Sequence, residues 1–147
     1  MVVVKSVQAS ADTIAASFER LFGLLRRMTP ADGMSLTAAS TLGRLDRGGP
    51  RRLTELAGLE GVTQPAMTQL VSRLERDGLA RRAADPADGR VVLVQVTDAG
   101  REAIRQRRAV RAQRLSELLA TLAPAERSAI IAALPALDRL SDLLPPN

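Results

Sequence analysis

The 147-residue sequence contains neither cysteine nor histidine. The chain therefore has no thiol for a redox switch, no imidazole for general-base chemistry or pH sensing, and no residues for a zinc-finger site. Because Lys5 is the only lysine, the serine and threonine hydroxyls also lack the usual groups that activate a nucleophile. The sequence thus predicts no metal site and no cofactor, and an enzyme is the weakest of the functional alternatives.

Aromatic residues make up only 1% of the sequence, and they are Phe18 and Phe22. Leucine, alanine and valine must therefore fill the core, and the chain length favours one structural unit. The apolar opening before Lys5 is too short for a signal peptide, and no apolar run approaches the length of a membrane span. We therefore expect a cytoplasmic protein with no membrane partner.

Basic residues outnumber acidic ones by 21 to 16, which gives a formal net charge of +5 and a pI near 11.3. Such a balance favours polyanionic partners. All the cations except Lys5 are arginines. A genome with GC-rich codons explains the choice of arginine, but it does not explain the net positive sign or the clustering.

The spacing of apolar residues predicts a mainly α fold with one small β-hairpin. Pro30 is expected to stop the first helix, Ser35 or Thr37 to cap the second, and Pro135 to kink or split the last. The expected helices cover 9–28, 34–48, 53–59, 63–76, 97 to about 122, and 124–144, and the expected strands cover 79–83 and 91–96.

The stretch from Arg52 to Thr97 has the outline of a winged helix-turn-helix: a short helix, a glycine turn, a second helix and a two-stranded ribbon. In this motif the second helix enters the major groove, and its N-terminal residues reach the base edges. The apolar residues of that helix recur at i, i+3, i+4 and i+7, which predicts a buried stripe. This stripe consists of Met67, Leu70, Val71 and Leu74.

The other faces of this helix carry side chains suited to reading DNA. Glutamines bond adenine edges bidentately, threonines bond phosphates or bases, alanine or proline contacts a thymine methyl, and Arg73 is the best candidate for a guanine or phosphate contact. The candidates are Thr63, Gln64, Pro65, Ala66, Thr68, Gln69, Ser72 and Arg73. The alternative is a polar face that only contacts water.

The ribbon places Arg81 and Arg82 on one strand and Arg90 at the start of the other. Cations on such a hairpin can lie along phosphates or enter the narrow minor groove. We expect Asp88 to hold the Arg90 side chain by a charge-assisted bond and so to aim it. The alternative is an ordinary hairpin whose charged edges discourage aggregation.

The helices at the two ends of the chain are amphipathic, and the central module is too small to cover both apolar stripes. We expect these stripes to pack against each other and against a second copy of the chain, which predicts a homodimer. Residues 1–34 and 100–147 are thus the predicted dimerisation helices, and residues 35–99 the predicted DNA-binding module.

Motifs in the ribbon resemble those of the MarR family of bacterial transcription regulators. The family's wing signature is Asp-x-Arg, five residues, then Leu-Thr-x-x-Gly. Here Asp88-Gly89-Arg90 is followed by Val96-Thr97-Asp98-Ala99-Gly100, so only the leucine is replaced. Leu79-Ala80-Arg81-Arg82 and the recognition-helix start Thr63-Gln64-Pro65-Ala66-Met67-Thr68 are also similar, and the resemblance covers about residues 10–144.

The resemblance implies a homodimer with interlocked terminal helices, which reads a pseudo-palindromic site in double-stranded DNA and lies on the bacterial nucleoid when bound. The family's wing arginine corresponds to Arg90 and its orienting aspartate to Asp88. Many members release DNA when an aromatic or phenolic anion binds between the dimerisation helices and the winged module. The equivalent crevice would be lined from the first, second and fifth helices, with Phe18, Phe22, Arg26 and Met34 as candidates; otherwise these are core or surface residues.

The predicted function is therefore a dimeric, sequence-specific repressor that a small aromatic or phenolic ligand relieves. A non-specific architectural DNA-binding protein and a protein-interaction module on the same fold are the alternatives. Peroxide sensing is excluded, because the cysteine that some members use is absent.

Overall fold

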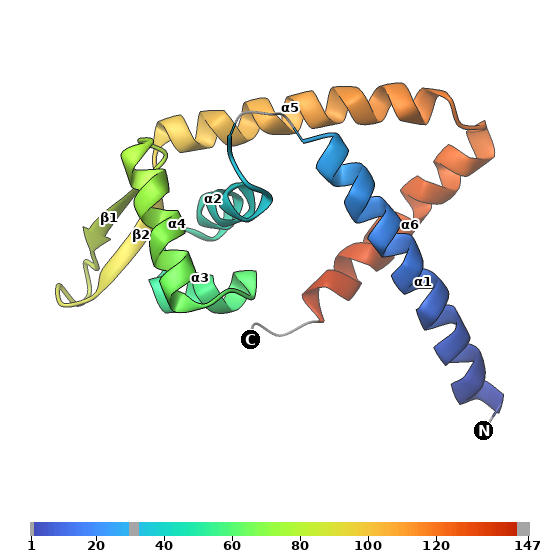
Figure 1. The fold of residues 1–147 in the computed structure, drawn as a ribbon, viewed down its shortest axis with the longest axis horizontal. Coiled ribbons are helices and arrows are strands. Elements are labelled where there is room, and N and C mark those ends of the chain that lie inside the picture. Colours follow the sequence, from blue (N-terminus) through green and yellow to red (C-terminus); the bar gives the residue numbers. More distant parts are fainter. Residues whose placement is uncertain (1, 30–32, 144–147) are drawn as a thin grey trace.

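The computed structural model describes residues 2–29 and 33–143, with side chains described from residue 10 onward apart from residue 142. Within these residues the chain forms six helices and one hairpin, which confirms the predicted mainly helical winged fold (Figure 1). The elements are α1 (Val2–Arg27), α2 (Leu36–Gly48), α3 (Leu53–Glu60), α4 (Gln64–Arg76), β1 (Ala80–Ala84), β2 (Val92–Val96), α5 (Asp98–Ala120) and α6 (Pro124–Asp142).

The helix boundaries follow local side-chain chemistry. Ser35 rather than Thr37 caps α2, because its Oγ accepts the backbone N–H of Ala38 at 3.0 Å. Thr63 caps α4 and Thr97 caps α5 in the same way. Helix α1 begins at Val2, seven residues before the expected start at residue 9. The expected stop at Pro30 and the last expected apolar position, Leu144, lie outside the described residues.

Helix α6 runs unbroken from Pro124 to Asp142 with Pro135 inside it, so the expected split at this proline is wrong. A proline removes one backbone donor from the helical ladder, and the bonds on either side can keep the helix continuous. No helix in the described ranges combines the length and apolarity needed to cross a membrane.

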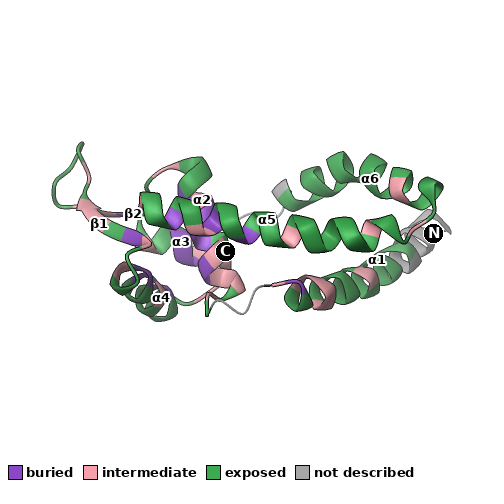
Figure 2. Ribbon diagram, turned by 90° about the horizontal axis from the view of Figure 1, so that it is seen from above, coloured by how far each residue is buried: buried purple, intermediate pink, exposed green. Residues whose placement is uncertain are grey.

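Helix α5 connects two ends of the molecule that differ in packing. One end holds α2, α3, α4 and the hairpin, and the other holds α1 and α6 (Figure 1). Seen from above, α1 and α6 lie on opposite sides of α5 rather than against each other (Figure 2). Within a single chain the terminal helices therefore do not cover each other's apolar stripes, and that part of the expectation is wrong.

The core belongs to the winged end. It is built from one apolar face of each of α2, α3 and α4, the inner face of the hairpin and Ile104 of α5. Gly100, at the start of α5, fits closely against this core, since a Cβ at this position would lie 2.1 Å from the carbonyl oxygen of Leu79. The glycine of the wing signature thus allows α5 to approach the base of the hairpin.

The hairpin is a two-stranded antiparallel sheet in which Arg82 pairs with Val94. Its strands begin one residue later than expected, at Ala80 and Val92. The outer edge of β2 is covered by Arg51, which exchanges two backbone hydrogen bonds with Val94 at 3.1 and 2.8 Å. The hairpin is thereby fixed to the segment that precedes α3.

Candidate nucleic-acid interface

Helix α4 buries one face and exposes the other. Met67, Val71 and Leu74 are buried in the core, and Leu70 is partly buried against it, as the spacing predicted. Every candidate DNA contact on this helix is exposed. These are Thr63, Gln64, Pro65, Ala66, Thr68, Gln69, Ser72 and Arg73. The turn before α4 is set by Gly61, whose φ of 62° lies in the left-handed region that glycine adopts without strain.

The exposed side chains of α4 differ in how far the protein already uses them. The Thr63 hydroxyl accepts the Ala66 N–H as a helix cap, and the Thr68 hydroxyl donates to the carbonyl of Gln64 at 2.9 Å. Gln64, Gln69 and Arg73 form no side-chain hydrogen bond or ion pair with any other described residue. These three side chains keep their full hydrogen-bonding capacity for a partner.

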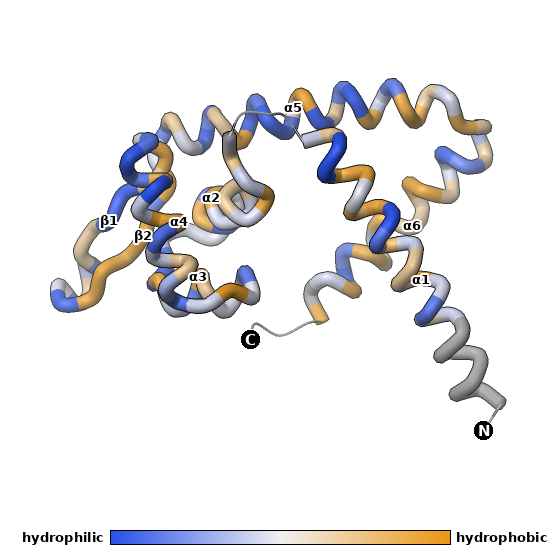
Figure 3. Tube along the Cα trace, viewed as in Figure 1, coloured by the Kyte–Doolittle hydropathy of each residue, from blue (hydrophilic) through white to orange (hydrophobic). Residues whose placement is uncertain are grey.

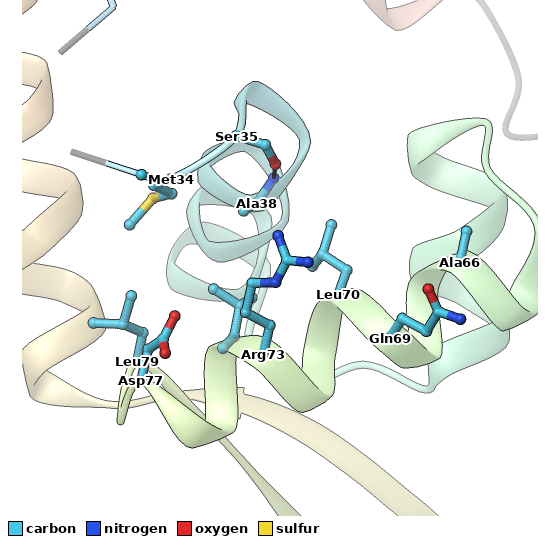
Figure 4. Close-up of a pocket in the computed structure, with 11 residues that line it drawn as sticks. Met34, Ser35, Ala38, Ala66, Gln69, Leu70, Arg73, Asp77 and Leu79 are labelled. Atoms are coloured by element: carbon cyan, nitrogen blue, oxygen red, sulfur yellow. Dashed lines mark hydrogen bonds between the residues drawn. The ribbon is translucent and has the colours of Figure 1, made fainter. Parts of the chain in front are cut away.

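Arg73 lies towards the C-terminal end of α4, beside a cavity of about 450 Å³ that this helix shares with the start of α2 (Figure 4). Ala66 and Gln69 line the same cavity from α4, and Met34 lines it from the other side. Because the N-terminal residues of a recognition helix approach the bases most closely, this position suits Arg73 to a phosphate better than to a base edge.

At the wing tip, Asp88 acts on the backbone rather than on the guanidinium. Its Oδ1 accepts the backbone N–H of Arg90 at 3.1 Å, and its carbonyl accepts the N–H of Val91 at 2.9 Å. None of the ion pairs among the described residues includes Arg90, which is exposed. The expected side-chain bond from Asp88 to Arg90 is therefore not formed in this structure, and Asp88 shapes the turn instead.

The two arginines of β1 have different surroundings. Arg81 is exposed, whereas Arg82 turns back to the recognition helix and forms an ion pair with Glu75. A guanidinium nitrogen of Arg82 also lies 3.4 Å from the Ser72 hydroxyl. Sequence reasoning missed Glu75, because helix periodicity does not reveal a partner that lies on a strand seven residues later.

A second cavity, of about 310 Å³, lies where α1, α2 and α5 meet. Phe22, Leu25 and Ile104 contribute apolar walls. Four arginines line it without any acidic residue, namely Arg47, Arg107, Arg108 and Arg111. Of the candidates taken from the resemblance, Phe22 lines this cavity, Met34 lines the cavity beside α4, and Phe18 and Arg26 line neither of the two.

Arg107 of α5 is buried, at 4% exposed. Its Nη2 donates to the carbonyl of Met34 at 2.9 Å, which ties α5 to the segment before α2. Burial lowers the pKa of the neighbouring Arg111 guanidinium, and the like charges of Arg107 and Arg108 lower it further. The cavity is thus a site of concentrated positive charge.

Comparison with known proteins decides the family. The sequence model of the MarR family matches residues 34–92. An uncharacterized HTH-type transcriptional regulator of Mycobacterium bovis is 37% identical over 117 residues, which cover 80% of this chain and 82% of that protein. The chain belongs to the MarR family. It is a DNA-binding transcriptional regulator and not an enzyme.

Solved structures agree with this assignment. The crystal structure of RV1404 from Mycobacterium tuberculosis is 27% identical and covers 92% of this chain and 97% of its own, with a TM-score of 0.81. A second structure is that of BpsR from Bordetella bronchiseptica, described as concerning the regulation of its DNA binding by 6-hydroxynicotinic acid. It is 23% identical and covers 87% of this chain and 91% of its own, with a TM-score of 0.62. At that identity the second likeness concerns the fold alone.

Proposed function

We propose that this MarR-family regulator is a dimeric, sequence-specific repressor that occupies a pseudo-palindromic promoter site. One observation carries the proposal: an exposed polar recognition helix lies at one end of the molecule, and apolar helix faces are exposed at the other. Leu21 is 54% exposed on α1 and Ile131 is 63% exposed on α6. Exposed apolar surface of this extent favours a protein partner.

The dimer proposal assigns residues 1–34 and 100–147 to subunit contact and residues 35–99 to DNA. Hydrophobic residues recur along α1, α5 and α6 (Figure 3). The exposed ones are Ile14, Phe18, Leu21, Phe22, Val110, Leu115, Leu118, Ile130, Ile131, Leu134, Leu137 and Leu140. A second copy related by a two-fold axis would cover these faces and place two α4 helices in successive major grooves, about 34 Å apart.

In the DNA contact that we propose, α4 reads bases and the wing binds the backbone. Gln64 and Gln69 bond adenine edges, while the small side chains of Pro65 and Ala66 contact thymine methyl groups. Arg73 and Arg81 bind phosphates, and Arg90 binds a phosphate or enters the minor groove. Affinity then falls steeply with salt, because each neutralised phosphate releases counterions.

The proposed effector is a small aromatic or phenolic anion in the cavity between α1, α2 and α5. The cavity combines the aromatic ring of Phe22 and the apolar Ile104 with four guanidinium groups, and a planar carboxylate pairs bidentately with such a group. A ligand there would contact both the terminal helix α1 and the winged module. It would thereby change the separation of the two recognition helices, which is how it would release DNA.

The test is selection of bound fragments from the source genome with purified protein, followed by footprinting and light scattering. A preferred inverted repeat with half-sites one helical turn apart, bound by two chains, is expected. Uniform binding to genomic and random DNA would indicate an architectural protein instead. Negligible DNA affinity at low salt would indicate a protein-interaction module.

A further inference from the structure

Glu75 lies in the last turn of α4, and both of its carboxylate oxygens contact one residue of β1. Its Oε1 accepts the backbone N–H of Arg82 at 3.0 Å, and its Oε2 accepts a guanidinium N–H of the same residue. The side chains of Glu75 and Arg82 are 26% and 31% exposed, respectively. A charge-assisted pair with two bonds defines a single geometry more firmly than one surface contact does.

The backbone bond lies on the outer edge of the hairpin. Val94 directs both its N–H and its carbonyl to Arg51, away from β1. Arg82, which faces Val94 in the register, is therefore at a non-hydrogen-bonded position, and its N–H points away from β2. Among the described residues the sheet has no third strand to supply an acceptor at this edge, and the Glu75 carboxylate takes that place.

The hairpin is thus held on both edges. Arg51 fixes β2 to the segment before α3, and Glu75 fixes β1 to the recognition helix. A strand rises by about 3.3 Å per residue, so a small rotation at Arg82 becomes a larger displacement at the wing tip several residues further on. The orientation of the tip relative to α4 depends on the bonds near the base.

We propose that Glu75 is a positioning residue for DNA binding: it fixes the wing on the recognition helix so that Arg90 meets the backbone while α4 occupies the major groove. Arg82 then serves DNA binding through Glu75 rather than by direct contact. The inference rests on the wing contact of Arg90 in the proposed function. It adds that Glu75 and Arg90 affect DNA affinity through the same wing contact, although Glu75 itself does not touch DNA.

A double-mutant cycle tests this coupling. Glu75→Gln, Arg90→Ala and the double variant are titrated against a fluorescein-labelled duplex recovered by selection with the unmodified protein, over a series of salt concentrations. Glu75→Gln is expected to weaken binding by at most about fivefold, the loss expected for Arg90→Ala, because both residues act through the same phosphate contact. Like Arg90→Ala, it should lower the salt slope by about 0.9 for each phosphate that the wing no longer neutralises. The double variant should bind no more than about twofold more weakly than Arg90→Ala alone, because coupled sites are not additive.

Glu102→Gln is the matched control. It also removes a carboxylate from an arginine pair, the one with Arg105, but on the exposed face of α5. Its affinity and salt slope should match those of the unmodified protein or rise slightly with the added positive charge. Arg82→Gln breaks the Glu75 pair from the other side and should reproduce the Glu75→Gln pattern, so that the test does not depend on one variant folding.

Hydrogen exchange gives a readout without DNA. Amides of residues 80–84 should exchange faster in Glu75→Gln than in Glu102→Gln, at an unchanged melting temperature. Full additivity of Glu75→Gln and Arg90→Ala, with unchanged exchange in the hairpin, would overturn the positioning role and leave the wing contact standing. A lack of effect of Arg90→Ala alone would instead overturn the wing contact, and the positioning inference with it.

Discussion

The two ends of this molecule differ in how far they bury their apolar side chains. In the winged end, Leu42, Leu56, Met67, Val71 and Val94 are completely buried, so this end contains its own hydrophobic core. In the helical end, most of the described large apolar residues of α1 and those of α6 remain exposed (Figure 2). The winged end thus has a hydrophobic core of its own, whereas the helical end has exposed apolar faces that the second copy in the dimer we propose would cover.

This difference relates stability to function. A core that is complete within one chain holds the recognition helix rigidly, as base readout requires. In the dimer that we propose, the exposed apolar faces would make the arrangement of the two DNA-binding modules depend on subunit contact, and therefore adjustable. Helix α5 links the two ends, because Ile104 lies in the winged core while Val110 and Leu118 lie in the exposed apolar face.

The largest effect is expected from a charge in the apolar face of the helical end. Leu134→Glu, at a side chain that is 48% exposed on α6, should separate the dimer, because a buried unpaired carboxylate is costly. Loss of one of two modules should weaken specific DNA binding about a thousandfold, to the non-specific level. Light scattering and DNA titration measure both effects. Ser128→Glu, also exposed on α6, is the control, and an unchanged dimer in Leu134→Glu would contradict the assignment of this face.

Truncating one large aliphatic side chain to alanine at each end, and comparing the free energies of unfolding, tests whether only the winged end has a core. Leu56→Ala removes a fully buried side chain from the winged core and should lower the free energy of unfolding by about 2–5 kcal/mol in urea. Ile131→Ala, measured in the monomeric Leu134→Glu background, should change it by less than about 0.5 kcal/mol, because the side chain is already 63% exposed. Similar losses at both sites would show that the helical end also has a core within one chain.

The winged end was largely predictable from sequence, because its elements depend on local residue types. Thr63 and Thr97 are caps, Pro65 fits the first turn of a helix, and the apolar spacing of α4 defines its buried face. Sequence patterns also identified the amphipathic helices at both ends. They could not show that α1 and α6 lie on opposite sides of α5 (Figure 2), because an apolar stripe does not specify what covers it.

The partners of three arginines could not be predicted from the sequence. Arg107 is buried against a backbone carbonyl, Arg82 pairs with a carboxylate, and the expected bond from Asp88 to the Arg90 guanidinium is not formed. A guanidinium on a long side chain can reach phosphate, carboxylate or carbonyl equally well, and only the fold decides which of these lies within reach.

Two substitutions in the winged end separate affinity from specificity. Arg90→Ala removes an exposed cation of the wing tip and should cost about 1 kcal/mol on every sequence, with a lower salt slope. Gln64→Ala should cost about 1–3 kcal/mol on the preferred site but little on sites altered at the base pair that it reads. Titrations at fixed salt against the selected duplex and its single-base variants measure both. A sequence-dependent loss in Arg90→Ala would reassign the wing to base reading.

The smallest effect is expected at the cavity that joins the two ends. Burial lowers the pKa of Arg111, and the like charges of Arg107 and Arg108 lower it further. Folding therefore brings these like charges close together. The Arg111 guanidinium stays protonated around neutral pH in both the folded and unfolded states, so this repulsion opposes folding throughout that range. Arg108→Gln should therefore raise the free energy of unfolding, by less than about 1 kcal/mol because water screens an exposed side chain.

The same substitution should have the opposite effect on ligand binding. Benzoate, used as a small aromatic anion, should raise the melting temperature of the unmodified protein, because a ligand that binds only the folded state stabilises it. The rise should be smaller in Arg108→Gln, which removes one of the four guanidinium groups that line the cavity. Arg20→Gln, an exposed arginine on α1 that is not among the cavity-lining residues, is the control. If benzoate shifts both variants equally, its binding does not involve this cavity, and the proposed effector site is wrong.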